Sequence, residues 1–382
     1  MQITMQIAPP NWKKIMSSFK IAILSGDGIG PEISKQAVRV LKSLEKKNSH
    51  VFECQELEFG ANAYFANGKS FPNDTKRACD DADAILKGPI GLSHYESEKI
   101  PLEERPERGA LLPLRRRLNT YANFRPILLP KSMTHFSPLK SKVVGEGIDI
   151  IMIRELIGGL YFGVKERGKN INGVRYAKET LEYDEQQIRQ ILIVAFEQAM
   201  KRKKLLHNIH KNNVLVSSVL WNEICDEISQ DYPAVTVVHM LVDAAATHLC
   251  LNPSQFDVMV MENMFGDILS DQGGGILGSL GLMPSACLGH DKAYYEPSHG
   301  SAPDIAGQNI ANPYSMIGSV ALMLEMSFGL ISEAKTIWNA MHSIFDDGFV
   351  THDLAEDNID SAILSTSQFG DKVIEKIKIV GA

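Results

Sequence analysis

The feature that most restricts the fold of this chain is an alternation of short, mostly apolar runs with longer amphipathic stretches. Short apolar runs are typical of buried strands, and amphipathic stretches are typical of helices that cover a sheet. The expected strands are residues 19–24, 51–57, 83–88, 148–153, 214–219, 235–239 and 256–261. The expected helices are residues 32–46, 185–204, 220–230 and 243–251, with three more after residue 304. The alternation predicts an α/β fold built on an open sheet.

Two polar segments interrupt the alternation. Residues 96–109 contain proline and many charged side chains, and we expect a surface loop there. Residues 165–184 are polar with little periodicity, which fits a protruding arm.

Composition narrows the classes of function. The 382 residues include 39 Lys and Arg against 46 Asp and Glu, so the formal net charge is −7. This balance argues against binding to nucleic acid or to an anionic membrane surface. No apolar run approaches the roughly 20 residues that span a bilayer. Any anionic ligand must therefore be held by a local cluster of basic side chains.

The five cysteines are scattered along the chain without a Cys-x-x-Cys motif. Such a pattern is typical of reduced thiols in a cytoplasmic protein. The first 17 residues lack the architecture of a signal peptide, and we expect them to form a tail. The chain length suggests about two domains.

A glycine-rich turn, Ser25-Gly26-Asp27-Gly28-Ile29-Gly30, follows the first expected strand. Pro31 suits the first position of the next helix, where its missing N–H has no intrahelical partner. The dinucleotide fingerprint Gly-x-Gly-x-x-Gly is incomplete, because its third glycine is missing: position 31 is Pro and position 33 is Ile. We therefore reject a Rossmann fold at this turn.

The stretch from Met261 to Gly275 carries two aspartates four residues apart, Asp267 and Asp271. In a helix this spacing puts both carboxylates on one face. Repulsion between them would be relieved by a hard cation, Mg²⁺ or Mn²⁺, bound through oxygen ligands. A solvated helix face with an acid near its N-terminus explains the same spacing. The spacing alone leaves both interpretations open.

Five arginines stand near the middle of the sequence: Arg115, Arg116, Arg117, Arg125 and Arg154. Neighbouring side chains on a helix point about 100° apart, so at most one of the three adjacent arginines faces a given site. We expect Arg116 and Arg117 to be solvated. Arg115 and Arg125 converge only if the chain bends between them, and Arg154 follows an expected strand.

Four further residues have ordinary interpretations when taken singly. Tyr161 lies in a glycine-punctuated turn, Lys211 suits a surface, Asp243 suits a helix start and His299 lies in a loop. Together with three arginines that clamp carboxylates and aspartates that hold a divalent ion, they describe metal-assisted chemistry on a small dicarboxylate. The lysine and the tyrosine would be the acid–base groups.

Several long motifs occur in an order that resembles a known family, the decarboxylating β-hydroxyacid dehydrogenases, which include isocitrate and isopropylmalate dehydrogenases. The resemblance extends from Phe19 to the C-terminus. The matching segments are GDGIGPEI (26–33), PERGALLPLR (106–115), YANFRP (121–126), RELIGGLYFG (154–163), FGDILSD (265–271), GSLGLMPSA (278–286) and HGSAPDIAGQNIANP (299–313).

The resemblance implies a role for each matching residue. Arg115, Arg125 and Arg154 would bind the carboxylates of a 2-hydroxy dicarboxylate. Lys211 would be the general base and Tyr161 the general acid. The ligands of Mg²⁺ or Mn²⁺ would be Asp243, Asp267 and Asp271, and Asp243 would also contact the substrate. The residues that hold NAD would be His299, Gly300, Ser301, Ala302, Asp304 and Asn312.

The resemblance also implies an architecture with two domains and an open sheet unrelated to the Rossmann fold. The cofactor domain would be discontinuous, 18–120 and 278–382, after a tail of residues 1–17. Residues 121–277 would form the substrate and dimerisation domain, with the arm at about 164–184. The enzyme would be a homodimer with a composite active site, in which Lys211 and Asp243 come from the partner subunit.

Leu111 and Leu112 suggest the substrate within this family. A branched alkyl group requires an apolar wall, so 3-isopropylmalate is expected, with 4-methyl-2-oxopentanoate and CO₂ as products in leucine biosynthesis. The alternatives are isocitrate, homoisocitrate and D-malate or tartrate. A non-catalytic regulatory subunit would show gaps in the set of site residues. A simple metal-binding module leaves the arginines unexplained.

The sequence departs from the family pattern in three places. His210 precedes Lys211, Glu262 adds a negative charge near the site, and Gly273–Gly275 interrupts an expected helix with three glycines. None of these changes removes a residue of the expected site.

Overall fold

A computed structural model describes residues 18–45, 50–355 and 362–379. The ten strands of its main sheet lie in the order β2-β1-β3-β12-β11-β4-β5-β10-β8-β9. Their bounds are β1 Ser18–Leu24, β2 Val51–Leu57, β3 Ala84–Lys87, β4 Ala122–Leu129, β5 Ile148–Glu155, β8 Leu205–His210, β9 Thr236–Leu241, β10 Val258–Met261, β11 Pro284–Leu288 and β12 Ala293–Pro297. The predicted α/β open sheet is confirmed.

The sheet is parallel except around its centre, where β4 runs antiparallel to both β5 and β11, and β11 runs antiparallel to β12. Strands on the β2 side of the β11–β4 boundary come from residues 18–87 and 284–297. Strands on the β9 side come from residues 122–261. The division into the two domains named above stays a prediction.

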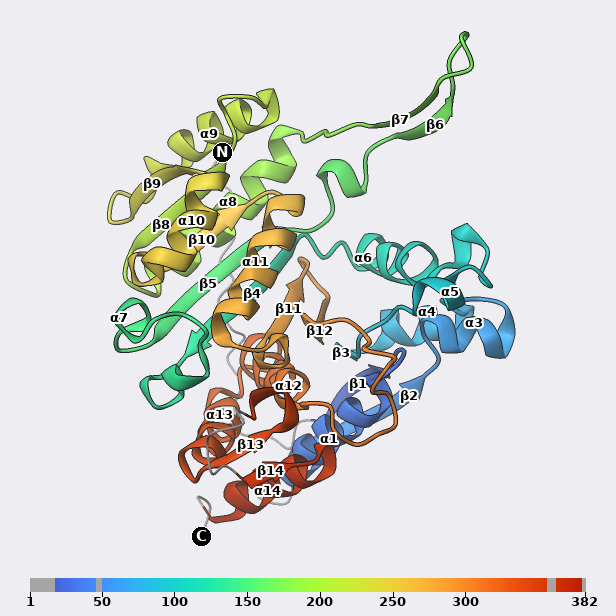
Figure 1. The fold of residues 1–382 in the computed structure, drawn as a ribbon, viewed down its shortest axis with the longest axis vertical. Coiled ribbons are helices and arrows are strands. Elements are labelled where there is room, and N and C mark those ends of the chain that lie inside the picture. The colour runs from blue at the N-terminus through green and yellow to red at the C-terminus, as the bar shows by residue number, and fades with distance from the viewer. Residues whose placement is uncertain (1–17, 46–49, 356–361, 380–382) are drawn as a thin grey trace.

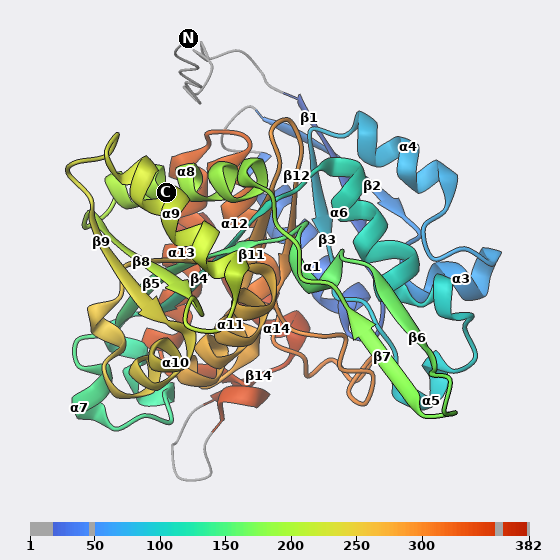
Figure 2. The same cartoon turned by 90° about the horizontal axis from the view of Figure 1, so that it is seen from above.

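Helices cover both faces of this sheet. Their bounds are α1 Gly30–Ser43, α3 Ala61–Asn67, α4 Asn73–Asp81, α5 His94–Ser97, α6 Leu112–Leu118, α7 Ser141–Val144, α8 Glu185–Met200, α9 Val216–Ser229, α10 Val242–Leu251, α11 Asn263–Leu277, α12 Tyr314–Met326, α13 Ile331–Asp346 and α14 Thr366–Ile379. α1, α12, α13 and α14 pack together beside β11 and β12 (Figure 1). α8 and α9 lie over β10 and β8, with α10 and α11 on the opposite side (Figure 2).

Helix α8 illustrates how the sequence places these layers. Its apolar residues recur at helical spacing and are buried against the sheet. Asp184 and Gln187 form a reciprocal capping box at its N-terminus, which satisfies two backbone donors that would otherwise lack partners. The residues of the buried stripe are Ile188, Ile191, Leu192, Ala195, Phe196 and Ala199.

Two small strand pairs lie outside the main sheet. β6 Lys165–Lys169 and β7 Arg175–Glu179 form an antiparallel hairpin that stands away from the body (Figure 1). β13 Phe349–Thr351 pairs with β14 Ala362–Leu364 in parallel. The expected tail, residues 1–17, lies outside the described residues.

The expected strand at 214–219 is wrong, because those residues lead into helix α9. The strand is β8, Leu205–His210, which begins after α8 has ended in a turn with Lys204 at φ 59°. The β-branched run favoured a strand by composition, but Val214 and Val216 are exposed. The buried positions further along recur at helical rather than alternating spacing, from Trp221 to Ile224 and Ile228.

Four smaller expectations are also corrected. The expected helix 185–204 ends at Met200, and the expected helix 32–46 begins at Gly30 and ends at Ser43. Residues 96–109 are not a plain loop, because they include a 3₁₀ turn, Leu102–Glu104, and a π-helix, Pro106–Leu111. Arg154 lies within β5 rather than after it.

No helix among the described residues is both long enough and apolar enough to cross a membrane.

Candidate active site

Strands β4 and β5 place two of the predicted arginines on one face of the sheet. Asn123 and Arg125 are two residues apart on β4, so their side chains point to the same face, and Arg125 Nε donates to Asn123 Oδ1 at 2.8 Å. In the antiparallel register Asn123 lies opposite Arg154 of β5. Both arginines are almost completely buried.

Arg115 reaches the same region from helix α6. The chain bends after α6 through Asn119, which adopts a left-handed conformation with φ 48°, before β4 begins. Arg115 is buried and its Nε donates to Tyr294 Oη at 3.0 Å. Arg116 and Arg117 are exposed as expected, and Arg117 pairs with Asp80.

Helix α11 covers this face of the sheet and brings both predicted aspartates to the arginines. Asp267 pairs with Arg154 and accepts a hydrogen bond from Tyr161 Oη at 2.6 Å. Asp271 accepts from Arg125 Nη1 at 3.2 Å. The structure therefore joins Tyr161 and the basic side chains to the Asp267–Asp271 face of one helix.

Electrostatics in this cluster favour a charged Asp267. Burial opposes ionisation, but Arg154, the Tyr161 hydroxyl and Arg125 together lower the pKa of Asp267. Burial and the neighbouring charges of Arg125 and Arg115 lower the pKa of Arg154 to about 10. The crowded guanidinium groups make the site receptive to additional carboxylates.

Tyr161 keeps its proton at neutral pH. Burial and the hydrogen bond to Asp267 raise the pKa of Tyr161 to about 12. A protonated hydroxyl in a half-buried position can act as a general acid. The pKa of Asp271 is raised by burial and by the charge of Asp267. A cation bound between Asp267 and Asp271 would offset the repulsion between the two carboxylates. Their oxygen donors suit Mg²⁺ or Mn²⁺.

The N-terminal half of α11 explains two features of its sequence. Glu262 is the N-cap, and its carboxylate accepts from the backbone N–H groups of Met264 and Phe265, both at 3.1 Å. A Cβ at Gly266 would lie 2.4 Å from Arg154 Cγ, so glycine lets the arginine side chain pass against the helix.

Two of the three glycines in the second half of α11 serve close packing, whereas a Cβ at Gly275 would meet open space. A Cβ at Gly273 would lie 2.6 Å from Ile127 Cδ1 of strand β4. A Cβ at Gly274 would lie 2.3 Å from Met283 Sδ and 2.5 Å from Leu280 Cδ2. At Gly273 and Gly274 the helical penalty of about 1 kcal/mol per glycine is therefore offset by the close approach of α11 to β4 and to the segment that carries Leu280 and Met283.

The third predicted metal ligand does not join the other two within one chain. Asp243 is at the start of α10, and its Oδ1 lies 2.6 Å from Lys211 Nζ. Among the described residues no three His, Cys, Asp or Glu side chains are gathered closely enough to hold a metal. Lys211 follows β8, in a turn where His210 Nδ1 accepts the Asn212 N–H at 3.2 Å. The side chain of Asp243 is 66% exposed and is therefore free to contact another molecule.

The predicted cofactor loop borders a pocket of 340 Å³. The predicted residues that line it are His299, Gly300, Ala302 and Asn312. Apolar side chains on its walls include Ile29, Leu280 and Ile305. A polar loop facing an apolar wall fits the adenosine half of a nicotinamide dinucleotide.

The other two predicted cofactor residues have different positions. Ser301 is buried, and its Oγ donates to Gly91 O at 2.8 Å. Asp304 is exposed and is not among the residues that line the pocket. A different carboxylate, Asp353, lines it and accepts from Asn312 Nδ2 at 3.1 Å.

Leu111 and Leu112 lie at the junction of the π-helix and α6. They precede Arg115 by four and three residues, so they share its side of the helix. Both are partly exposed, which leaves apolar surface beside a predicted carboxylate-binding arginine.

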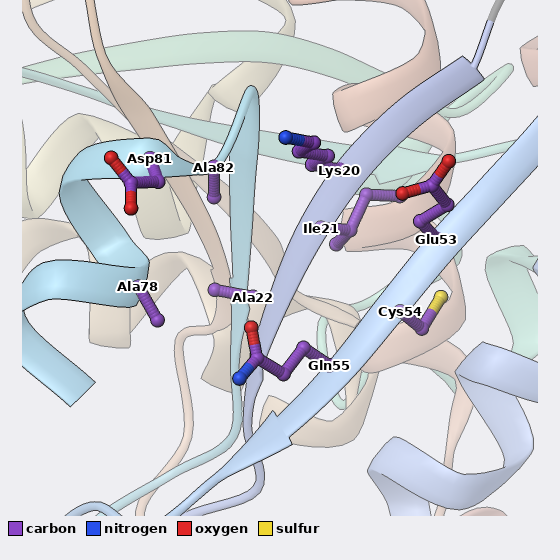
Figure 3. Close-up of a pocket in the computed structure, with 9 residues that line it drawn as sticks. All are labelled: Lys20, Ile21, Ala22, Glu53, Cys54, Gln55, Ala78, Asp81 and Ala82. Carbon is purple, nitrogen blue, oxygen red and sulfur yellow. The ribbon is translucent and has the colours of Figure 1, made fainter. Parts of the chain in front are cut away.

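A larger hollow of 430 Å³ lies elsewhere, over β1, β2 and α4 (Figure 3). None of the predicted site residues lines it. Burial raises the pKa of its Cys54, so the thiol is not activated. Its β1 residues, Lys20 to Ala22, lie in the middle of the strand and not at its carboxyl end. Ligands of open α/β sheets bind at the carboxyl ends of strands, so we assign the function to the arginine cluster.

Sequence reasoning did not identify several polar residues that hold the site together. These are Asn123, Tyr183, Asn263, Ser270 and Tyr294. Ser270 and Asn263 lie in the stretch that drew attention to Asp267, but a single amide or hydroxyl has no spacing pattern. Their partners come from distant parts of the chain, so only the fold reveals them.

The chain is similar to known proteins over most of its length. The model of the isocitrate/isopropylmalate dehydrogenase family matches residues 20–373. The 3-isopropylmalate dehydrogenase of Thermotoga maritima is 46% identical over 359 residues, which cover 94% of this chain and 99% of the relative. The enzyme of the same name from Desulfitobacterium hafniense is 47% identical over 355 residues, 93% of this chain and 99% of the relative.

Solved structures show the same likeness. The crystal structure of isocitrate dehydrogenase from Methylococcus capsulatus aligns with a TM-score of 0.82 and 32% identity, covering 94% of this chain and 99% of that one. A β-decarboxylating dehydrogenase from Thermococcus kodakarensis aligns with a TM-score of 0.75 and 31% identity, covering 95% and 97%.

Proposed function

Because the chain belongs to the isocitrate/isopropylmalate dehydrogenase family, we propose that it catalyses the NAD-dependent oxidative decarboxylation of 3-isopropylmalate, in leucine biosynthesis. The products are 4-methyl-2-oxopentanoate and CO₂. The observation that carries this proposal is the convergence of three buried arginines and a protonated tyrosine on Asp267 of helix α11.

The arginines bind the two carboxylates of the substrate. Arg125 and Arg154 are held in place by Asn123 and Asn263, so little side-chain entropy is lost when a carboxylate binds. Arg115, anchored by Tyr294, lies beside Leu111 and Leu112, which would contact the isopropyl group.

Two side chains move protons. Lys211, which lies beside Asp243, would in its neutral form take the proton of the C2 hydroxyl, and a nicotinamide cofactor, when bound, would supply the hydride acceptor. Tyr161 donates a proton to C3 of the enol that remains after CO₂ has left. Asp267, Asp271 and Asp243 would hold Mg²⁺ or Mn²⁺, which when bound stabilises negative charge on the C2 oxygen.

The enzyme is a homodimer with composite active sites. Within one chain the exposed Asp243 is not gathered with Asp267 and Asp271, which is expected if each Lys211–Asp243 pair serves the neighbouring subunit. Apolar side chains exposed on the same helices, Ile268 of α11 and Leu251 of α10, support burial against a second copy.

The pocket beside loop 299–312 would hold NAD, and a carboxylate there would favour a free ribose 2′-hydroxyl over a 2′-phosphate. All five cysteines are free thiols, which supports a cytoplasmic location.

One assay tests the proposal directly. The purified enzyme with Mg²⁺ and NAD is given 3-isopropylmalate, isocitrate, homoisocitrate and D-malate in parallel, and NADH and CO₂ are measured. We expect the highest kcat/KM for 3-isopropylmalate, with one CO₂ released per NADH. A higher kcat/KM for any of the other three would overturn the substrate assignment.

A further inference from the structure

Behind Arg154 and Tyr161 lies a buried pair of residues, Asn263 and Tyr183, which no sequence motif singled out. The proposed mechanism uses Asn263 only to hold Arg154 and gives Tyr183 no role. Asn263 is the first residue of α11 and is completely buried. Its Oδ1 accepts from both Nε and Nη2 of Arg154, at 3.0 and 2.7 Å. Two donors on one acceptor fix the plane of the guanidinium group.

Asn263 also holds the turn that carries Tyr161. Its Nδ2 donates to Gly158 O at 3.1 Å. One residue later Gly159 adopts φ 68° and begins the 3₁₀ turn Gly159–Tyr161. A single amide therefore fixes Arg154 on one side and the start of the Tyr161 turn on the other.

Tyr183 contacts both the backbone of Asn263 and the turn that carries Tyr161. Its hydroxyl accepts the backbone N–H of Asn263 at 3.0 Å and donates to Glu262 Oε2 at 3.2 Å. Its ring lies directly under the turn, because a Cβ at Gly158 would be 2.4 Å from Tyr183 Cε1 and one at Gly159 2.5 Å from its hydroxyl.

Glu155 completes the support of the turn. Its carboxylate accepts the backbone N–H groups of Ile157 at 2.8 Å and Gly158 at 2.9 Å, and it also interacts with the Tyr183 hydroxyl. Tyr183 is thus placed between two acidic side chains, Glu155 and Glu262, neither of which faces an arginine at hydrogen-bond distance within the described residues. The hydroxyl links Glu155 to the N-terminus of α11, which Glu262 also caps directly.

We propose that Asn263 and Tyr183 are positioning residues that set the distance between the substrate-binding guanidinium of Arg154 and the proton-donating hydroxyl of Tyr161. The inference rests on the proposed function. Asn263 acts on both groups, whereas the Tyr183 hydroxyl acts through the turn and the backbone of Asn263. Loss of the amide therefore affects substrate binding and proton transfer, and loss of the hydroxyl affects mainly proton transfer.

The test compares Tyr183→Phe and Asn263→Ala with the wild-type holoenzyme, using the hydroxy acid that the wild type oxidises best. Proton transfer alone is followed as exchange of deuterium from D₂O into C3 of the corresponding 2-oxo acid product. We expect Tyr183→Phe to lower this exchange rate roughly tenfold or more, with KM for the hydroxy acid almost unchanged. Asn263→Ala should lower the exchange rate and also raise KM roughly tenfold or more.

Tyr232→Phe is the matched control, because Tyr232 stacks on Phe196 away from the site. It should leave exchange and KM unchanged. Circular dichroism and the melting temperature establish that each variant folds. If Asn263→Ala does not fold, Tyr183→Phe decides alone, since it removes a single oxygen atom. A wild-type exchange rate in folded Tyr183→Phe overturns the inference. The inference is also overturned if both variants show the same fall in exchange rate and the same rise in KM. Failure of the wild type to oxidise 3-isopropylmalate overturns the proposed substrate instead, and oxidation of none of the four acids overturns both.

Discussion

At the scale of single residues, Asp271 shows how a carboxylate can be prepared for a cation. It is half exposed, it contacts Arg125, and burial together with the charge of Asp267 raises its pKa. We predict that Asp271→Asn raises the Mg²⁺ concentration needed for half-maximal activity by on the order of 10- to 100-fold, because a charged ligand is lost. Metal titration of NADH production measures this, and Asp231→Asn, at an exposed position, is the control. Full activity of the wild type in excess chelator would contradict the metal assignment.

His207 is a second residue with a measurable consequence. It is buried, packs edge-on against Phe256, and burial lowers its pKa to about 4 from 6.5. Between these values the unfolded chain binds a proton that the folded chain does not, so stability falls as the pH falls. We predict that, when the pH is lowered from 7 to 5, the free energy of unfolding of His207→Leu falls by about 2 kcal/mol less than that of the wild type. Urea unfolding at both pH values measures the difference, with His135→Leu, at an exposed position, as control. Equal losses would refute the prediction.

At the scale of elements, the junction between the π-helix and α6 should decide which substrate is used. Leu111 and Leu112 lie on the same side of the helix as Arg115, and burying an isopropyl group against them is worth about 1–3 kcal/mol. We predict that replacing both by Asn lowers kcat/KM for 3-isopropylmalate roughly 10- to 100-fold more than for D-malate. Leu102→Asn, at an exposed leucine of the same region, is the control. An equal loss on both substrates would mean that the two leucines are structural.

Two carboxylates near the cofactor loop are candidates for the group that distinguishes NAD from NADP. The sequence motif points to Asp304, whereas Asp353 is the one that lines the pocket. We predict a higher kcat/KM with NAD than with NADP, because a carboxylate beside the ribose repels a 2′-phosphate. Asp304→Asn and Asp353→Asn, assayed with both cofactors, identify which carboxylate discriminates, since only its loss should improve the use of NADP. Equal use of both cofactors by the wild type would refute the prediction.

Helix α11 also shows how much of the fold and site could be predicted from the sequence. Its start after a buried strand, and the sharing of one face by Asp267 and Asp271, follow from local spacing. The strand expected at 214–219 failed because a β-branched run was weighed above the helical period that continues through Trp221. The contacts of Asn263 could not be predicted, because its partners lie on β5 and in the turn at Gly158.

At the scale of the whole molecule, the position of Lys211 determines whether one chain can work alone. Lys211 and Asp243 form an ion pair with each other. Tyr161 donates a hydrogen bond to Asp267, beside the buried arginines. The order of the sheet places β8, which precedes Lys211, beyond β10 and β5. In a two-fold dimer, the Lys211–Asp243 pair of each subunit would lie beside the arginines, Tyr161 and Asp267 of its partner. Each active site would then contain all of the predicted residues.

Mixing two inactive variants distinguishes a composite site from a site within one chain. In a dimer of Lys211→Ala and Asp267→Asn subunits, one composite site receives both substitutions and the other receives neither. Random re-association makes half of the dimers mixed, so activity should recover to about a quarter of the wild-type value, although each variant alone is nearly inactive. Dissociated and re-associated chains are assayed for NADH production, and mixed dimers are counted by an affinity tag on one variant.

The control mixes Asp267→Asn subunits with Asp271→Asn subunits, because both positions lie on helix α11 and belong to the same half of the composite site. Its mixed dimers carry one substitution in each site, so activity should stay low. If both mixtures stay equally inactive while mixed dimers are present, each active site is built from a single chain.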